Sequence, residues 1–333
     1  RDTMRAAGLP PIPGAGEIPR TAADARRLAD EIGYPVLLKA SAGGGGRGMR
    51  IVEEPGDVEE AFTQASLESE KAFGNRELYI EKFITGGRHI EFQLLADVYG
   101  NAVHLGEREC SVQRNHQKLV EEAPSPVVSD EQRAEMGAKA AAAASRVGYV
   151  NAGTVEFLRD PDGHLWFMEM NTRLQVEHPV TEMITGFDIV AEQIAIAANR
   201  PLSITQDDVT ITGHAIECRI NAEDPDEGFK PTPGTVTTFA PPAAGDGLRI
   251  DTHVREGYVV PPFYDSMIAK LVTHGADRAD AIERMKKALA EFRIEGVKST
   301  IPIHQRVLEN EEFASGTYDT RLIGRMLGGD NHG

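Results

Sequence analysis

The spacing of apolar residues predicts alternating helices and strands in the first part of the chain. Ala25, Leu28, Ala29 and Ile32 recur at helical intervals, whereas the apolar run that follows them is continuous, as in a buried strand. The pattern predicts a helix over 21–32, strands over 34–40 and 49–52, a helix over 57–71 and a strand over 77–83. We therefore expect residues 12–84 to form a small unit of sheet and helices.

The rest of the chain follows a similar pattern with longer strands. It predicts strands over 89–95, 102–109, 212–221 and 264–274, and helices over 129–147, 278–292 and 302–310. We expect an α+β fold in which residues 85–333 are built on a mostly antiparallel sheet with flanking helices. Residues 1–8 resemble the end of a helix already under way, so residues 1–11 are expected to be the end of a truncated N-terminal region.

Composition narrows the classes of partner. The net charge of −17, from 35 Lys and Arg against 52 Asp and Glu, argues against a large nucleic-acid or anionic-membrane surface. No run of about 18 apolar residues could span a bilayer, and we expect a cytoplasmic protein. Cys110 and Cys218 lack the paired spacing of a zinc site and are expected to be reduced thiols.

A predicted hairpin brings candidate metal ligands together. If Asp162 and Gly163 form a two-residue turn, Glu156 lies directly across from Glu169, and two facing carboxylates need a proton or a cation. Asn171 lies on the same strand face as Glu169 and adds a third oxygen, a ligand set suited to Mg²⁺ or Mn²⁺. The alternative is a solvated hairpin edge.

Two further stretches suggest anion binding. The glycine run at 43–48 could direct backbone N–H groups at phosphate oxygens, with Lys39 reaching the same place, although such a run can also be a merely flexible tip. In 171–179, Arg173 offers a planar fork for a small oxyanion such as bicarbonate, and Glu177 could remove a proton from it. A surface cluster of ion pairs is the alternative.

Five stretches together resemble biotin carboxylase, the ATP-grasp component of acetyl-CoA carboxylase and related biotin-dependent carboxylases. They are residues 39–49, 107–124, 169–182, 214–225 and 262–267. The resemblance runs over nearly the whole chain and implies an ATP-grasp fold, in which 12–84 is the lid subdomain and 85–333 combines the main domain with the C-terminal domain. It also implies that the chain lacks the family's N-terminal domain and is poorly active alone.

The resemblance assigns a role to individual residues. For ATP these are Lys39, the amides of Gly45 and Gly46, the adenine-lining Glu81, Lys82, Phe83 and Ile84, and the histidines His89 and His116. Glu156, Glu169 and Asn171 are implied as ligands of Mg²⁺ or Mn²⁺. Lys118, Arg173, Gln175 and the Val176 amide are implied to bind bicarbonate, with Glu177 as general base and Arg219 beside the ureido oxygen of biotin.

The implied reaction is ATP-dependent carboxylation of biotin through carboxyphosphate, the first half-reaction of an acyl-CoA carboxylase. The implied partners are a biotin carboxyl carrier protein or domain, carboxyltransferase subunits and, for the full-length protein, a second copy of itself. Two other functions stay open on the residues alone. The chain could be another ATP-grasp ligase, or a non-catalytic fragment that binds nucleotide or docks a subunit.

Overall fold

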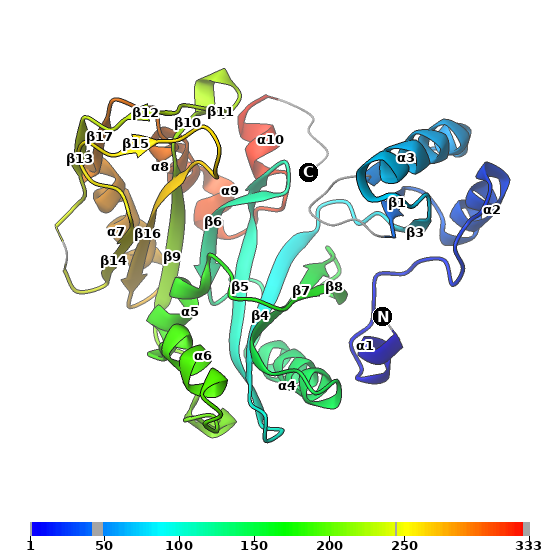
Figure 1. Cartoon of the computed structure of the whole chain (residues 1–333), viewed down its shortest axis with the longest axis horizontal. Coiled ribbons are helices and arrows are strands. Elements are labelled where there is room, and N and C mark those ends of the chain that lie inside the picture. Colours follow the sequence, from blue (N-terminus) through cyan, green and yellow to red (C-terminus); the bar gives the residue numbers. More distant parts are fainter. Residues whose placement is uncertain (1, 42–48, 244, 329–333) are drawn as a thin grey trace. The chain divides into compact units, whose positions relative to one another are not determined.

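The computed structural model describes residues 2–41, 49–243 and 245–328, which form two compact units (Figure 1). Unit 1 contains Pro10–Gly87 and Leu158–Met168. Unit 2 contains Asp2–Leu9, Arg88–Phe157 and the chain from Glu169 onward. The glycine run at 43–48, and with it Gly45 and Gly46, lies outside the described residues.

Unit 1 is built on a three-stranded antiparallel sheet with strand order β2-β1-β3. Its elements are α2 (Ala22–Ile32), β1 (Val36–Ala40), β2 (Met49–Val52), the 3₁₀ turn η1 (Pro55–Asp57), α3 (Val58–Phe73) and β3 (Leu78–Lys82). Thr21 and Asp24 form a capping box at the start of α2, which satisfies N–H groups that the helix itself leaves free. Leu28, Val36 and Ile80 are among the apolar side chains that close the core between the helices and the sheet.

The larger sheet has the strand order β14-β16-β9-β6-β5-β4-β7-β8. In chain order its strands are β4 (Arg88–Ala96), β5 (Ala102–Arg114), β6 (Gln117–Ala123), β7 (Asn151–Arg159), β8 (Leu165–Asn171), β9 (His214–Asn221), β14 (Leu248–Thr252) and β16 (Met267–Gly275). The pairs of β4 with β5, β5 with β6, β6 with β9, β9 with β16 and β16 with β14 are all antiparallel. The predicted α+β class with a mostly antiparallel sheet is thus confirmed.

The helices of unit 2 pack on this sheet or on one another. They are α4 (Asp130–Arg146), α5 (His178–Thr185), α6 (Ile189–Ala197), α7 (Arg278–Glu291), α8 (Ile301–Glu309), α9 (Glu311–Ser315) and α10 (Leu322–Met326), preceded in the chain by α1 (Asp2–Ala6). In Figure 1, α4 lies along β4 and β5, and α7 lies along β16. Cys218 and Leu271 from the sheet, and Met285 and Leu289 from α7, belong to the largest apolar core.

Short elements complete the C-terminal half of the chain. They are η2 (Gln206–Asp208), β10 (Glu223–Asp224), η3 (Pro225–Glu227), β11 (Lys230–Pro231), β12 (Gly234–Thr235), β13 (Thr238–Ala240), β15 (Val259–Val260) and β17 (Arg293–Glu295). They pair in twos, β10 with β11, β12 with β15 and β13 with β17. Within 2–41, 49–243 and 245–328, no helix has both the length and the apolar character needed to cross a bilayer.

The clearest difference from the sequence pattern lies between β5 and β6. The pattern predicted a strand ending at residue 109, whereas β5 continues to Arg114 and turns back into β6. Asn115 and His116 make the turn with φ of 49° and 62°, and Arg114 pairs with Gln117 across it. Positive φ at both central residues gives the turn a twist that matches the two strands, so a polar stretch without glycine becomes a tight hairpin.

A buried ion network ties the sheet to the helices that follow it. The fully buried carboxylate of Glu122 on β6 accepts hydrogen bonds from Arg278 Nε at 2.7 Å, from the phenol of Tyr318 at 2.5 Å and from a ring nitrogen of His214 at 2.6 Å. These three partners come from three separate parts of the chain, so the network fixes the sheet against its C-terminal helices.

We expect Glu122→Gln to flatten the acid dependence of stability. Burial opposes the charge of Glu122, but bonds from His214 and Arg278 hold its pKa at about 2. A depressed pKa stabilises the folded state above the carboxyl pKa of the unfolded chain, and this contribution is lost as the pH falls toward 2. It amounts to roughly 3 kcal/mol of the free energy of unfolding. Urea midpoints from pH 6 to pH 3 measure it, and an unchanged slope in the variant contradicts the assignment.

Candidate active site

Lys118 is the centre of a buried cluster of carboxylates in unit 2. Its Nζ atom lies 2.6 Å from Glu91 Oε2, 2.6 Å from Glu177 Oε1 and 3.3 Å from Glu156 Oε1. β6 supplies Lys118, β4 supplies Glu91 and β7 supplies Glu156, while Glu177 immediately precedes α5. Burial works against the charge of Lys118, but Glu91 and the other carboxylates raise its pKa well above the ordinary value. Lys118 is therefore held as a cation.

Glu91 is held as an anion by a second buried cation. Its Oε1 atom accepts a 2.6 Å hydrogen bond from Nε of Arg108, which is itself fully buried on β5 and also bonds to Gln93 and Thr181. Burial opposes ionisation of Glu91, but Lys118 and Arg108 together keep its pKa at about 2. Glu91 thus fixes the position of the Lys118 ammonium.

Glu177 lies between two cations. Lys118 contacts its Oε1 atom, and NH2 of Arg219 donates to its Oε2 atom at 2.8 Å. Arg219 on β9 also donates from Nε to Oε1 of Glu121 at 2.6 Å. The carboxylate of Glu177 is fully buried, so its orientation is set from both sides.

The loop before α5 carries the other predicted oxyanion-binding residues. Arg173 is exposed, and its NH1 atom donates to Gln175 Oε1 at 2.9 Å. Nε2 of Gln175 is 3.4 Å from Glu156 Oε1, and the carbonyl of Val176 accepts a 3.0 Å bond from Lys270. Gln175 therefore links the exposed guanidinium to the buried cluster.

The predicted turn between β7 and β8 is wrong in its detail. Asp160 N donates to His164 O and Gly163 N donates to Asp160 O, each at 3.0 Å, so Pro161 and Asp162 are the central residues and Gly163 follows with φ +93°. Proline fits the first central position of such a turn, and glycine adopts the positive φ without strain. The two-residue turn that placed Glu156 across from Glu169 is thus absent, and their pairing stays a prediction.

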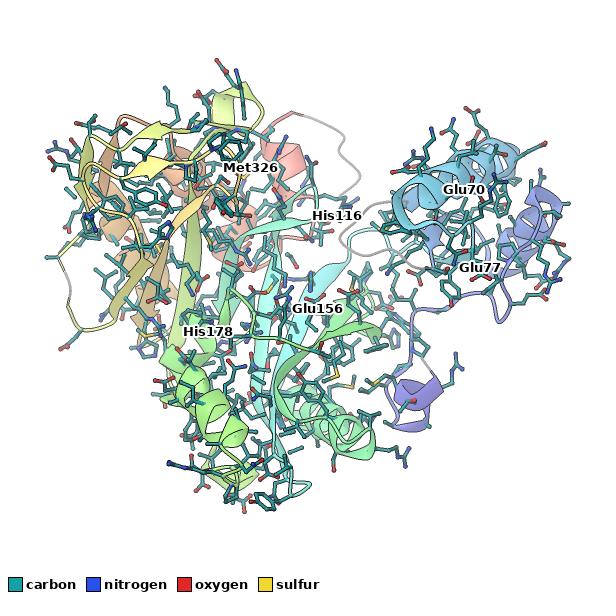
Figure 2. All side chains as sticks on the ribbon, in the orientation of Figure 1. Glu70, Glu77, His116, Glu156, His178 and Met326 are labelled. Atoms are coloured by element: carbon teal, nitrogen blue, oxygen red, sulfur yellow. The ribbon has the colours of Figure 1, made fainter. Side chains whose placement is uncertain are left out.

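Two potential metal ligands that the sequence analysis did not pair with Glu156 lie beside it. In the described part of the chain, the ligating atoms that gather within 4.8 Å around Glu156 belong to His89 and Glu91. His89 Nε2 is 3.4 Å from Glu156 Oε2. Burial would raise the pKa of Glu156, yet His89 and Lys118 hold it well below the ordinary value. Figure 2 shows Glu156, on β7, and His116 at the end of the β5–β6 hairpin.

The predicted nucleotide residues of unit 1 lie on its sheet and just beyond. Lys39 is on β1, and Glu81, which is buried, and Lys82 are on β3. Nζ of Lys82 donates to the carbonyls of Gly33 at 3.0 Å and Tyr34 at 2.8 Å. Phe83 and Ile84 are half-buried, and Phe83 N donates to Pro35 O. The roles of these residues stay predictions.

Several residues of the cluster had no place in the sequence prediction of the site. They are Glu91, Arg108, Glu121 and the fully buried Glu217. A signal for them existed, because each is a charged residue in a segment that also carries the apolar residues of a buried strand, where a charge without a partner is costly.

Family models cover most of the chain in two parts. Residues 1–205 match the carbamoyl-phosphate synthase L chain, ATP binding domain, and residues 217–325 match the biotin carboxylase C-terminal domain. The biotin carboxylase of a Nostoc species is 54% identical over 98% of this chain and 73% of its own length. The chain belongs to the biotin carboxylase family. The Bacillus subtilis biotin carboxylase 1 is 52% identical, over 97% of this chain and 72% of its own length.

Solved structures agree with this membership. The biotin carboxylase domain of the Hydrogenobacter thermophilus 2-oxoglutarate carboxylase, a dimer in complex with MgADP, ADP and bicarbonate, matches with a TM-score of 0.94. It is 48% identical over 98% of this chain and 72% of its own. The Campylobacter jejuni biotin carboxylase matches with a TM-score of 0.93 at 47% identity, over 97% of this chain and 72% of its own. The ATP-grasp fold implied by the sequence motifs is thus confirmed.

Proposed function

We propose that this chain catalyses the ATP-dependent carboxylation of biotin by bicarbonate. The observation that carries the proposal is the buried carboxylate of Glu177, held between the ammonium of Lys118 and the guanidinium of Arg219. A base flanked by two cations suits a reaction in which one anion is deprotonated and further negative charge then develops beside it. Relatives named biotin carboxylase, and a solved relative with bicarbonate and MgADP, support the same reaction.

The first step follows from the residues around Glu177. Lys118, Arg173, Gln175 and the amide of Val176 would bind bicarbonate, and Glu177 would accept its proton. The bicarbonate oxygen then attacks the γ-phosphorus of ATP, giving carboxyphosphate and ADP. Lys118 is held charged by buried carboxylates, so it would offset the charge on the transferring phosphoryl group without moving.

The nucleotide and metal residues fit a phosphate-bound divalent cation. Glu156 is an ionised, buried carboxylate, and Glu169 and Asn171 on β8 offer further oxygens, the ligand type that Mg²⁺ and Mn²⁺ prefer. A bound Mg²⁺ or Mn²⁺ would offset the charge of the ATP phosphates. Lys39, Gly45 and Gly46 would hold phosphate oxygens, Glu81, Lys82, Phe83 and Ile84 would line the adenine site, and His89 and His116 would complete it.

The second step uses the other cation on Glu177. Carboxyphosphate breaks down to CO₂ and phosphate, and phosphate takes the N1′ proton of biotin. Arg219 would stabilise the negative charge that then develops on the ureido oxygen, so that the nitrogen attacks CO₂. Its bonds to Glu121 and Glu177 hold its guanidinium in one orientation before biotin arrives.

The finer details of assembly are proposals as well. Biotin would reach the site on a carrier protein or domain, carboxyltransferase subunits would use the product, and the protein would act as a homodimer, as the Hydrogenobacter thermophilus domain does. A cytoplasmic location likewise stays a prediction.

Measurement of ADP release tests the proposed reaction. We expect release to require ATP, a divalent cation and bicarbonate, and to increase with free biotin. ADP release that ignores biotin but responds to ammonia or an amino acid would instead indicate another ATP-grasp ligase. Nucleotide binding without turnover, measured by calorimetry, would indicate a binding module.

We also expect Glu156→Gln and Glu169→Gln each to weaken Mn²⁺ binding in the presence of ADP by about tenfold or more, because each variant removes one charged ligand oxygen. Electron paramagnetic resonance of free Mn²⁺ measures the affinity. Glu70→Gln is the control, since Glu70 is an exposed carboxylate on α3 that is bonded to Arg76 and has no predicted part in metal or nucleotide binding. A loss in Glu156→Gln alone would remove Glu169 from the ligand set.

A further inference from the structure

Two buried glutamates face each other beside Arg219. Glu121 on β6 is paired with Glu217 on β9 in the antiparallel register, so their side chains lie on the same face of the sheet. Both residues are 0% exposed. The same face carries Ala123 and Ala215, which pack under Val180 and Ile184 of α5. The pair is therefore enclosed between the sheet and α5.

Arg219 is two residues beyond Glu217 on β9 and points to the same face. Its Nε atom donates to Glu121 Oε1 at 2.6 Å, and its NH2 atom donates to Glu177 Oε2 at 2.8 Å. Glu121 is thus the second carboxylate, besides that of the proposed base Glu177, that binds the guanidinium of Arg219. The position of Arg219 depends on how strongly Glu121 attracts it.

The two lysines near this pair of glutamates contact other groups. Lys118 contacts Glu91, Glu156 and Glu177, and Lys270 contacts Asp251 and the Val176 carbonyl. Both carboxylate oxygens of Glu217, and Oε2 of Glu121, are buried without a hydrogen-bond partner in the described part of the chain. Two ionised carboxylates at the roughly 5 Å spacing of cross-strand Cβ atoms would repel each other strongly in such a place.

We propose that Glu217 carries a proton at neutral pH, and that Glu121 and Glu217 together position Arg219 against Glu177. The proposal rests on the function proposed above for Arg219 and Glu177. Other titratable or charged groups on this side of the sheet include Arg108 and Cys110 of β5, Arg249 and Asp251 of β14, Lys270 of β16, Glu177, and His178 and Glu182 of α5. Of the carboxylates among these groups, Glu217 is the one without a bonded cation in the described part of the chain.

The electrostatics of the pair agree with this arrangement. Burial, followed by repulsion from Glu121, raises the pKa of Glu217 well above the ordinary carboxyl value. Burial also raises the pKa of Glu121 to about 7, against the opposing effect of Arg219. A raised pKa means that the proton is present at lower pH and leaves as the pH rises. Two ionised carboxylates would then compete for Arg219 and draw it away from Glu177.

Infrared spectroscopy tests the proton directly. We expect the wild-type protein near neutral pH to show the carbonyl stretch of a protonated, buried carboxylic acid, and Glu217→Gln to weaken it. Any remaining band belongs to other buried carboxyls whose pKa is raised, such as Glu121 and Glu109. Glu122→Gln is the matched control, since Glu122 is equally buried on β6 but bonded to Arg278 and His214, and that variant should keep the band. A wild-type spectrum without the band, or a band of undiminished intensity in Glu217→Gln, overturns the proposal.

Biotin-dependent ADP release tests the positioning role. An amide mimics a neutral carboxylic acid, so Glu217→Gln should keep the rate at pH 7 within about threefold of wild type and should resist the loss of rate at alkaline pH. Glu121→Gln, which removes the charge from the hydrogen bond that Arg219 donates to Glu121, should lower the rate about ten- to a hundredfold. Circular dichroism separates these effects from unfolding.

The outcomes distinguish the two proposals. If Glu217→Gln loses as much activity as Glu121→Gln, or loses activity at alkaline pH just as the wild-type protein does, Glu217 is not a neutral positioning residue. If the wild-type protein itself shows no biotin-dependent ADP release, the proposed function fails, while the infrared band still decides whether Glu217 is protonated.

Discussion

Glu177→Gln is expected to lower bicarbonate-dependent ADP release by about 10²- to 10⁴-fold, the contribution typical of a positioned general base. Glu177 accepts bonds from both Lys118 and Arg219 while fully buried, and glutamine keeps its size but cannot take a proton from bicarbonate. The KM for ATP should change far less than kcat. Steady-state rates at saturating ATP measure the effect.

A buried carboxylate outside the cluster supplies the control for this variant. Glu122→Gln removes an equally buried, ion-paired glutamate that lies on β6 among Arg278, His214 and Tyr318. Glu122→Gln should lower the free energy of unfolding and should change kcat much less than Glu177→Gln does. Equal losses of kcat in both variants would mean that Glu177 acts only through the fold, and an active Glu177→Gln would require a different base.

Arg219→Ala is expected to lower biotin carboxylation by about 10²- to 10³-fold, as is typical when one group that stabilises a developing oxyanion is removed. Binding of ATP should change much less, because the contacts of Arg219 are to Glu121 and Glu177. Arg219→Lys should recover little of the rate, since an ammonium cannot reproduce the two directed contacts of the guanidinium. Biotin-dependent ADP release and calorimetric nucleotide titration measure the two effects.

Arg249→Ala is the matched control. Arg249 also joins two carboxylates, Glu182 at 2.6 Å and Asp251 at 2.8 Å, but it lies on β14 and has no contact with Glu177. The rate of biotin-dependent ADP release by Arg249→Ala should stay near that of the wild-type protein. A large loss of ATP affinity in Arg219→Ala would instead place Arg219 in the nucleotide site.

Local sequence was sufficient for part of the site. Arg173, Gln175 and Glu177 occupy one short loop, and their side-chain types alone suggested an oxyanion site with a base. The structure places Glu177 beside Lys118, from 59 residues earlier, and beside Arg219, from 42 residues later. No local pattern contains those separations, because they are set by which strands are neighbours in the sheet.

The hairpin between β7 and β8 shows where local reasoning fails. Asp162 and Gly163 resemble a two-residue turn, yet Pro161 precedes them and occupies a central turn position. The carboxylate of Asp160 then accepts bonds from His164 N and Trp166 Nε1, each at 2.8 Å, which stabilises the longer turn. A change of one residue in a turn alters which side chains face each other, so the turn alone cannot place Glu156 opposite Glu169.

By itself the sequence determined the α+β class, most of the helices and strands, the family and the loop that holds Glu177, because hydrophobic periodicity and short motifs are local properties. Only the tertiary structure decided which of the buried side chains are ionised. Burial makes an isolated charge costly, so whether a glutamate is ionised depends on which cation the fold brings to it. Lys118 and Arg108 keep Glu91 ionised, whereas Glu217 faces Glu121 without a bonded cation.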